Sequence, residues 1–131
     1  MMSKVGTARG MRNSEFCLVP KGDTPTSSRF YSAVACGCVP LVVSDDMRHH
    51  LPFKARVNYS FIQHVHEKNF VADPTREVEA AMARLGPRLP ALRRLMLDAA
   101  PELLYEVDGS RVAENMLLEY ETQCTTLGHA A

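Results

Sequence analysis

The apolar positions of residues 16–44 predict a strand, a loop, a helix and a second strand. Residues 16–19 form a short apolar run that ends at Pro20. Residues 39–43 are apolar and β-branched without alternation, which is typical of a strand buried on both faces in a parallel sheet. Between the two runs, four residues keep the helical spacing i, i+3, i+4 and i+7: Phe30, Ala33, Val34 and Gly37. This order predicts a βαβ unit and an α/β fold.

The ends of the predicted helix carry matching signals. Serine and threonine residues stand just before it, where their side chains can cap the free N–H groups of a first turn. Gly37 stands where a helix usually ends.

The second half of the chain predicts helices more than strands. Residues 57–65 predict one or two short strands around Tyr59 and Phe61. Asp73 and Pro74 predict the start of a helix that ends at Gly86. Two further helices are predicted by apolar faces, one with Leu92, Leu95, Met96 and Ala99, the other with Ala113, Met116, Leu117 and Tyr120. We expect a loose lead-in over 1–13, one domain over 14–122 and an unstructured tail over 123–131.

Composition narrows the class of protein. A chain of 131 residues suits one domain, and its 15 basic and 15 acidic residues give a net charge of zero. This balance disfavours a nucleic-acid binder and a polybasic membrane surface, because both need an excess of Lys and Arg. No segment approaches the roughly 18–20 apolar residues of a membrane helix. Residues 1–12 lack a signal-peptide pattern, so we expect any membrane anchor to lie outside this sequence.

Four cysteines occur without a C-x-x-C pair, which argues against a zinc ribbon. Cys17 and Cys38 lie in apolar runs, where buried free thiols are common. If those runs are neighbouring strands, a disulfide between them is the alternative.

The loop over residues 20–28 is the candidate binding site. In open α/β sheets, ligands bind beyond the carboxyl ends of the strands. The loop leads into a helix N-terminus, which favours an anion, and Thr26, Ser27 and Ser28 add hydroxyl groups. Arg29 falls in the first turn, where a cation opposes the helix dipole unless an anion is bound. The alternatives for Arg29 are a solvated side chain or a pair with Asp23.

Residues 14–30 and 33–45 together resemble the central signature of the exostosin family of glycosyltransferases. The family's Pro-Phe pair is matched by Pro52 and Phe53, and its following aromatic segment by residues 57–61. The resemblance covers residues 14–70 well and extends loosely to about residue 100.

That resemblance implies a Rossmann-like C-terminal half of a two-domain GT-B fold. The implied activity is inverting transfer of a sugar from a nucleotide diphosphate sugar to a glycan, without a metal or other cofactor. Arg29 would contact the diphosphate, Ser27 and Ser28 would help to hold it, and Gly22 would allow close backbone approach. Ser32 stands where the family usually has an acidic residue that holds the ribose. The family also implies the lumenal side of the Golgi membrane, an N-terminal membrane anchor and a possible partner glycosyltransferase.

We expect the chain to be a fragment that lacks the acceptor domain, with the catalytic base unassigned. The alternative is a catalytically inactive module that binds a nucleotide or a partner, which Ser32 and the missing domain favour. A flavodoxin-like binding domain would explain the βαβ unit but not the signature.

Three other groups of residues are weaker candidates. Asp45 and Asp46 resemble the carboxylates of metal-dependent glycosyltransferases, but the resemblance places them in a loop. His64 and His66 lack a third zinc ligand, so a solvated strand face is the preferred interpretation. An arginine group between residues 84 and 94 is interpreted as a solvated helix face rather than a patch for an acidic acceptor.

Overall fold

The computed structural model describes residues 4–24 and 27–130. Its elements, in chain order, are α1 (Lys4–Arg12), β1 (Phe16–Pro20), α2 (Ser28–Ala35), β2 (Val39–Val43), the 3-10 turn η1 (Met47–His49), β3 (Gln63–His64), α3 (Glu67–Ala72), α4 (Pro74–Leu85), the 3-10 turn η2 (Gly86–Arg88), α5 (Leu89–Leu103) and α6 (Val112–Ala130).

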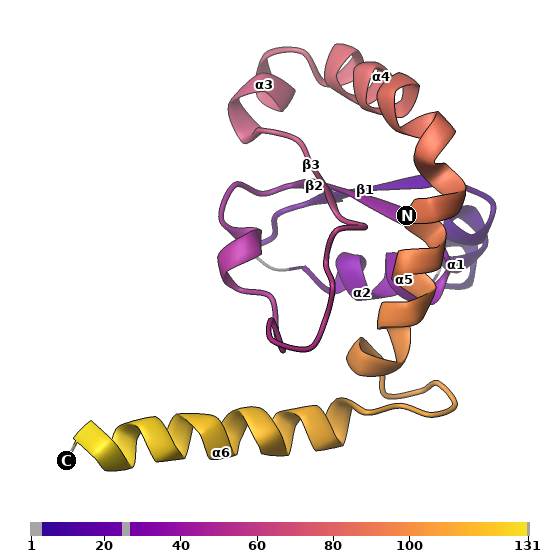
Figure 1. Cartoon of the computed structure of the whole chain (residues 1–131). Coiled ribbons are helices and arrows are strands. Elements are labelled where there is room, and N and C mark those ends of the chain that lie inside the picture. The colour runs from indigo at the N-terminus through magenta and orange to yellow at the C-terminus, as the bar shows by residue number, and fades with distance from the viewer. Residues whose placement is uncertain (1–3, 25–26, 131) are drawn as a thin grey trace.

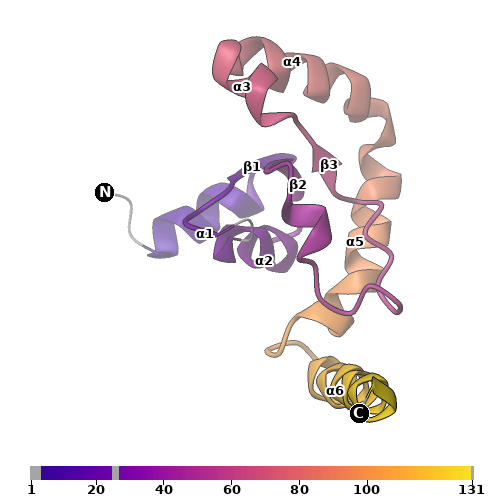
Figure 2. The same cartoon turned by 90° about the vertical axis from the view of Figure 1, so that its left-hand side faces the viewer.

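A parallel three-stranded sheet in the order β1-β2-β3 forms the centre of the molecule. α2 lies on one side of the sheet, and α3 and α4 lie on the opposite side (Figures 1 and 2). All five residues of β2 are buried, which matches their uninterrupted apolar sequence. The predicted α/β fold and the βαβ unit are confirmed.

The ends of α2 follow the local signals in the sequence. The Ser27 side chain caps the first turn by accepting a hydrogen bond from the Arg29 backbone N–H at 3.2 Å. At the other end, Gly37 adopts a φ of 74°. The Gly37 N–H donates to the Val34 carbonyl at 3.2 Å, and the Cys38 N–H donates to the Ala33 carbonyl at 3.0 Å. This pair of bonds is a Schellman motif, which stops the helix and turns the chain into β2.

A disulfide joins Cys17 in β1 to Cys38, which immediately precedes β2. The sequence left open whether these cysteines were free thiols or a pair. Phe16 lies beside Val39 in the parallel register, so the two cysteines come together diagonally with a Cα–Cα distance of 5.7 Å. Cys36 and Cys124 are free.

Three expectations were wrong in detail. Of the strand region 57–65, only Gln63–His64 is a strand, because the Asn58 side chain accepts the Ser60 backbone N–H at 3.0 Å and forms a turn instead. The lead-in contains α1, whose last turn carries Arg9 and Arg12, charges that suit a helix C-terminus.

The tail is the third difference, since α6 extends through residues expected to be unstructured. The apolar face predicted for this helix is exposed, with Met116 at 51%, Leu117 at 71% and Tyr120 at 68%. The helix instead packs its start on the body through Val112 and the buried amide of Asn115. Figure 1 shows α6 lying below the other elements.

The Gly37→Ala variant should lower the free energy of unfolding by about 1–2 kcal/mol, the cost of a left-handed backbone for a residue with a Cβ. No atom lies within 4 Å of a Cβ built at Gly37, so the loss measures backbone strain alone. Gly10→Ala is the control, because Gly10 is equally open but lies within α1 and has no positive φ. Urea unfolding checks this, and equal losses in the two variants would contradict it.

Reduction of the disulfide should lower the free energy of unfolding by about 3 kcal/mol, as expected for a closed loop of this size in the chain-entropy account. The loop spans a sequence separation of 21 residues. Urea unfolding with and without a thiol reductant measures the loss. The Cys17→Ala/Cys38→Ala double variant should have the stability of the reduced chain and no response to reductant. A reductant-insensitive wild type would contradict the prediction.

Candidate anion site at the carboxyl edge of the sheet

The carboxyl ends of the three parallel strands lie at one edge of the sheet and lead into the candidate site. The Lys21 backbone N–H donates to the Val43 carbonyl at 3.1 Å, which aligns the exit of β1 with the exit of β2. The Val65 N–H donates to the Val42 carbonyl at 2.9 Å, which aligns the exit of β3. The loop that follows β1 then reaches the N-terminus of α2. The sequence placed its candidate site at this edge.

Ser27, Ser28, Arg29 and Ser32 come together at the first turn of α2. Ser27 is the N-cap of α2, and its side chain accepts a hydrogen bond from the Arg29 backbone N–H. Ser28 and Arg29 are the first two residues of the helix, and both are exposed. The Ser32 hydroxyl donates to the Ser28 carbonyl at 3.2 Å. Gly22 lies exposed in the loop before the helix. Thr26, which the sequence also suggested, falls outside the described residues.

The Arg29 guanidinium has no anionic partner among the residues that the structure describes. Among the described residues, it forms no ion pair, so the alternative of a pair with Asp23 is not what the structure has. A cation in the first turn is repelled by the partial positive charge of a helix N-terminus. The first turn of α2 therefore presents two sources of positive potential to solvent, the backbone and the guanidinium, and both would stabilise an anion.

A group of charged residues at the carboxyl ends of the strands was not found from the sequence. Lys21 Nζ lies 3.1 Å from Glu67 Oε2, and the Asp45 backbone N–H donates to Glu67 Oε1, also at 3.1 Å. The Glu67 N–H donates in return to Asp45 Oδ1 at 3.2 Å, and His66 Nδ1 lies 3.6 Å from the same oxygen. The signal that could have revealed the group is that each residue closely follows a strand of one parallel sheet.

No metal centre emerges from these side chains. Within residues 4–24 and 27–130, no three His, Cys, Asp or Glu residues are arranged to hold a metal ion. The Asp45 carboxylate, one of the two considered for a metal, is instead engaged by Glu67 and His66.

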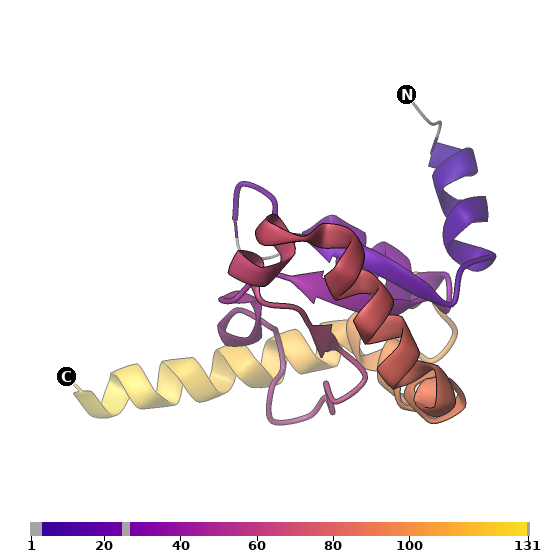
Figure 3. The ribbon, with the colours of Figure 1, turned by 90° about the horizontal axis from the view of Figure 1, so that it is seen from above.

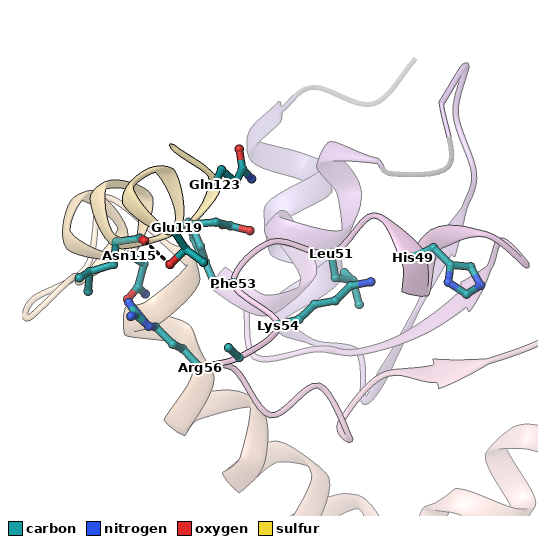
Figure 4. A pocket seen from close by; sticks show the side chains of 11 residues that line it. His49, Leu51, Phe53, Lys54, Arg56, Asn115, Glu119 and Gln123 are labelled. Atoms are coloured by element: carbon teal, nitrogen blue, oxygen red, sulfur yellow. Dashed lines mark hydrogen bonds between the residues drawn. The ribbon is translucent and has the colours of Figure 1, made fainter. Parts of the chain in front are cut away.

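A separate cavity of about 430 Å³ lies between residues 49–56 and α6 (Figure 4). His49 and Lys54 line it from the first segment, and Glu119 and Gln123 line it from α6. Phe53, also in the lining, has a φ of 56°, a strained value for a residue other than glycine. We place the candidate site at the sheet edge because the central part of the sequence signature, residues 14–30, and the helix N-terminus with Arg29 coincide there.

Asn115 connects α6 to α5 and to the loop that holds Arg56. Its side chain is fully buried, accepts from Arg56 Nη1 at 3.4 Å and donates to the Glu102 carbonyl at 3.3 Å. A second donation goes to the Glu102 carboxylate. A buried amide of this kind needs partners for every polar atom, so Asn115 specifies how α6 is attached.

The family model for the exostosin GT47 domain matches residues 3–79. The chain belongs to the exostosin GT47 family of glycosyltransferases. It is 39% identical over 66 residues to a probable arabinosyltransferase of Arabidopsis thaliana, a match that covers 50% of this chain and 14% of the relative. It is 25% identical over 107 residues to a probable xyloglucan galactosyltransferase of the same plant, covering 78% and 24%.

An animal relative matches the same region. The exostosin-1 homolog of Caenorhabditis elegans is 42% identical over 50 residues, which covers 38% of this chain and 13% of the relative. The chain thus spans less than a quarter of the length of each of these relatives. No solved structure matches the chain significantly.

The pKa of His64, in β3, should lie below its ordinary value of 6.5, because partial burial, the Arg48 charge and His66 all disfavour the imidazolium. The folded state then binds fewer protons than the unfolded state around pH 6, so this residue's contribution to stability falls as the pH drops below 6.5. An NMR titration of the His64 ring checks this. The Arg48→Gln variant should raise the pKa toward 6.5, and an unchanged pKa would contradict the role of Arg48.

Proposed function

We propose that this chain is the donor-binding part of an inverting exostosin-like glycosyltransferase. It binds a nucleotide diphosphate sugar, whose sugar is transferred to a glycan acceptor. The observation that carries the proposal is the exposed Arg29, which lies at a helix start on the carboxyl edge of a parallel sheet and has no anionic partner within residues 4–24 and 27–130. Membership of the exostosin family supports the same site.

The proposed chemistry needs charge stabilisation at the leaving group. The acceptor hydroxyl oxygen attacks the anomeric carbon from the face opposite the diphosphate. The bond from that carbon to the diphosphate oxygen breaks, and a base takes the hydroxyl proton. Arg29 and the backbone N–H groups of α2 would stabilise the departing diphosphate in place of a metal ion. Ser27 and Ser28 would add contacts to the phosphates, Gly22 would let the loop backbone approach them, and Ser32 would face the ribose.

The remaining parts of the proposal concern the parent protein. The chain would work with an acceptor domain across a GT-B cleft, with the base supplied there or by this chain. The names of the plant relatives, an arabinosyltransferase and a xyloglucan galactosyltransferase, support a cell-wall type of glycan as one class of acceptor. A partner glycosyltransferase is a further proposed component.

We place the parent protein on the lumenal side of the Golgi membrane. The Cys17–Cys38 disulfide supports this proposal, because disulfides persist in oxidising compartments such as those of the secretory pathway. In the described part of the chain, no helix is both long and apolar enough to cross a bilayer.

A second candidate function is a catalytically inactive module that binds a nucleotide or a partner. The observation in its favour is Ser32, where the family usually has an acidic residue. Its hydroxyl hydrogen is already donated to the Ser28 carbonyl, so only its oxygen lone pairs remain for a ligand. A neutral acceptor of this kind would hold a ribose more weakly than a carboxylate does.

Calorimetric titration of the chain with UDP and with GDP tests the donor site. Binding of one nucleotide should weaken about tenfold to a hundredfold in Arg29→Ala, the loss expected for hydrogen bonds to a charged group. Arg76→Ala is the matched control, because Arg76 is an exposed arginine in the first turn of α4. It should bind as the wild type does.

Two results would contradict the proposal. Equal losses in the Arg29 and Arg76 variants would show an unspecific charge effect. Failure of the folded wild type to bind either nucleotide would remove the donor site and favour the module that binds a partner.

A further inference from the structure

Glu67 joins the segments that follow all three strands of the sheet. Lys21 directly follows β1, Asp45 comes two residues after β2, and Glu67 comes three residues after β3. The Glu67 carboxylate uses one oxygen for the Lys21 ammonium and the other for the Asp45 backbone N–H. These partners are 46 and 22 residues away along the chain. Seen from above, α3 and the loop after β1 lie at the same end of the sheet (Figure 3).

The two contacts of the Glu67 carboxylate, with Lys21 and with Asp45, lie where the loops leave the sheet. Lys21 is the first residue after β1 and begins the described segment 21–24. Its backbone is already bound to the Val43 carbonyl, so the Glu67 contact adds a second, side-chain anchor to the same residue. Asp45 begins the segment after β2, and its backbone and side chain both bond to Glu67. A single carboxylate therefore restrains the exits of two loops relative to a third strand.

The Glu67 carboxylate is partly shielded from water, which strengthens its hydrogen bonds. The Glu67 side chain is 28% exposed, whereas that of Lys21 is 56% exposed. An exposed ion pair alone contributes little to stability, because water competes for both charges. Here the same carboxylate also accepts a backbone N–H, and hydrogen bonds to a charged acceptor are stronger than neutral ones. The expected effect is therefore on the position of the loops more than on the stability of the fold.

We propose that Glu67 is a positioning residue for the nucleotide site: by holding Lys21 and Asp45, it orders residues 21–24, which present Gly22 to the diphosphate. This role rests on the function proposed above. Glu67 need not touch the ligand. A loop that is already ordered loses less conformational entropy when it binds, so removal of the carboxylate weakens binding through the free state.

The experiment compares four full-length chains: wild type, Glu67→Ala, Glu67→Gln and Glu79→Ala. Glu79 is an exposed glutamate of α4 and forms no hydrogen bond or ion pair within the described residues, so its variant controls for the loss of one negative charge. The first measurement is amide hydrogen exchange without nucleotide. Exchange should become faster at Asp45 and over residues 21–24 in Glu67→Ala and stay at the wild-type rate in Glu79→Ala.

The second measurement is the affinity for whichever of UDP and GDP binds the wild type. It should fall about three- to tenfold in Glu67→Ala, the range expected when one or two restraints on a binding loop are lost. Glu67→Gln keeps one acceptor oxygen for the Asp45 N–H but lacks the charge that holds Lys21, so it should restore part of the affinity. The midpoint of thermal unfolding of Glu67→Ala should stay near that of Glu79→Ala. If Glu67 only stabilised the fold, the midpoint of Glu67→Ala would be clearly lower.

The outcomes separate this proposal from the one on which it rests. Wild-type exchange rates in Glu67→Ala would overturn the restraint itself, with or without a nucleotide. Faster exchange with unchanged affinity would overturn the positioning role. If the wild type binds neither nucleotide, the proposed donor site fails, and the positioning role fails with it even where exchange shows that Glu67 orders the loops.

Discussion

The burial of β2 on both faces is the constraint on which the rest of the structure depends. Its five residues are all apolar and all buried, and it is paired with β1 on one side and β3 on the other. A strand with no polar side chain lowers its free energy only by removing both faces from water, so it occupies the centre of the sheet. Once it is central, the carboxyl ends of all three strands lie at one edge, and the residues that follow them become neighbours.

Charged residues gather at the carboxyl ends of the strands, next to the buried centre of the sheet. Lys21, Asp45 and Glu67 lie just past the last strand residues, where they remain partly in water and can still bond to one another. Arg29, at the start of α2, has no such partner within the described chain. The contrast matters for function, because a satisfied cluster orders the loops while an unsatisfied cation leaves attraction for a ligand. The proposed nucleotide site combines the two.

Much of the local structure could be predicted because its causes lie within a few residues. The Ser27 cap, the Gly37 stop and the Asp73 cap of α4 each depend on neighbouring backbone groups, and each appears as expected. Of the features that the sequence did not reveal, one has a local cause and one depends on residues far apart in the chain. Asn58 diverted residues expected in a strand into a turn, which the hydrophobic pattern could not reveal. The role of Glu67 was missed because its partners are far away in the sequence.

The sequence by itself determined the βαβ unit and the family, and it suggested where the proposed anion site lies, since apolar spacing, capping residues and an ordered signature are all present along the chain. The tertiary structure decided which cysteines pair, which residue ties the loops together and which face of α6 is covered. Side-chain periodicity had favoured the face with Leu117, yet the buried positions are Val112 and Asn115. The reason is that such contacts depend on distances through space, and those are fixed only when the sheet brings separate segments together.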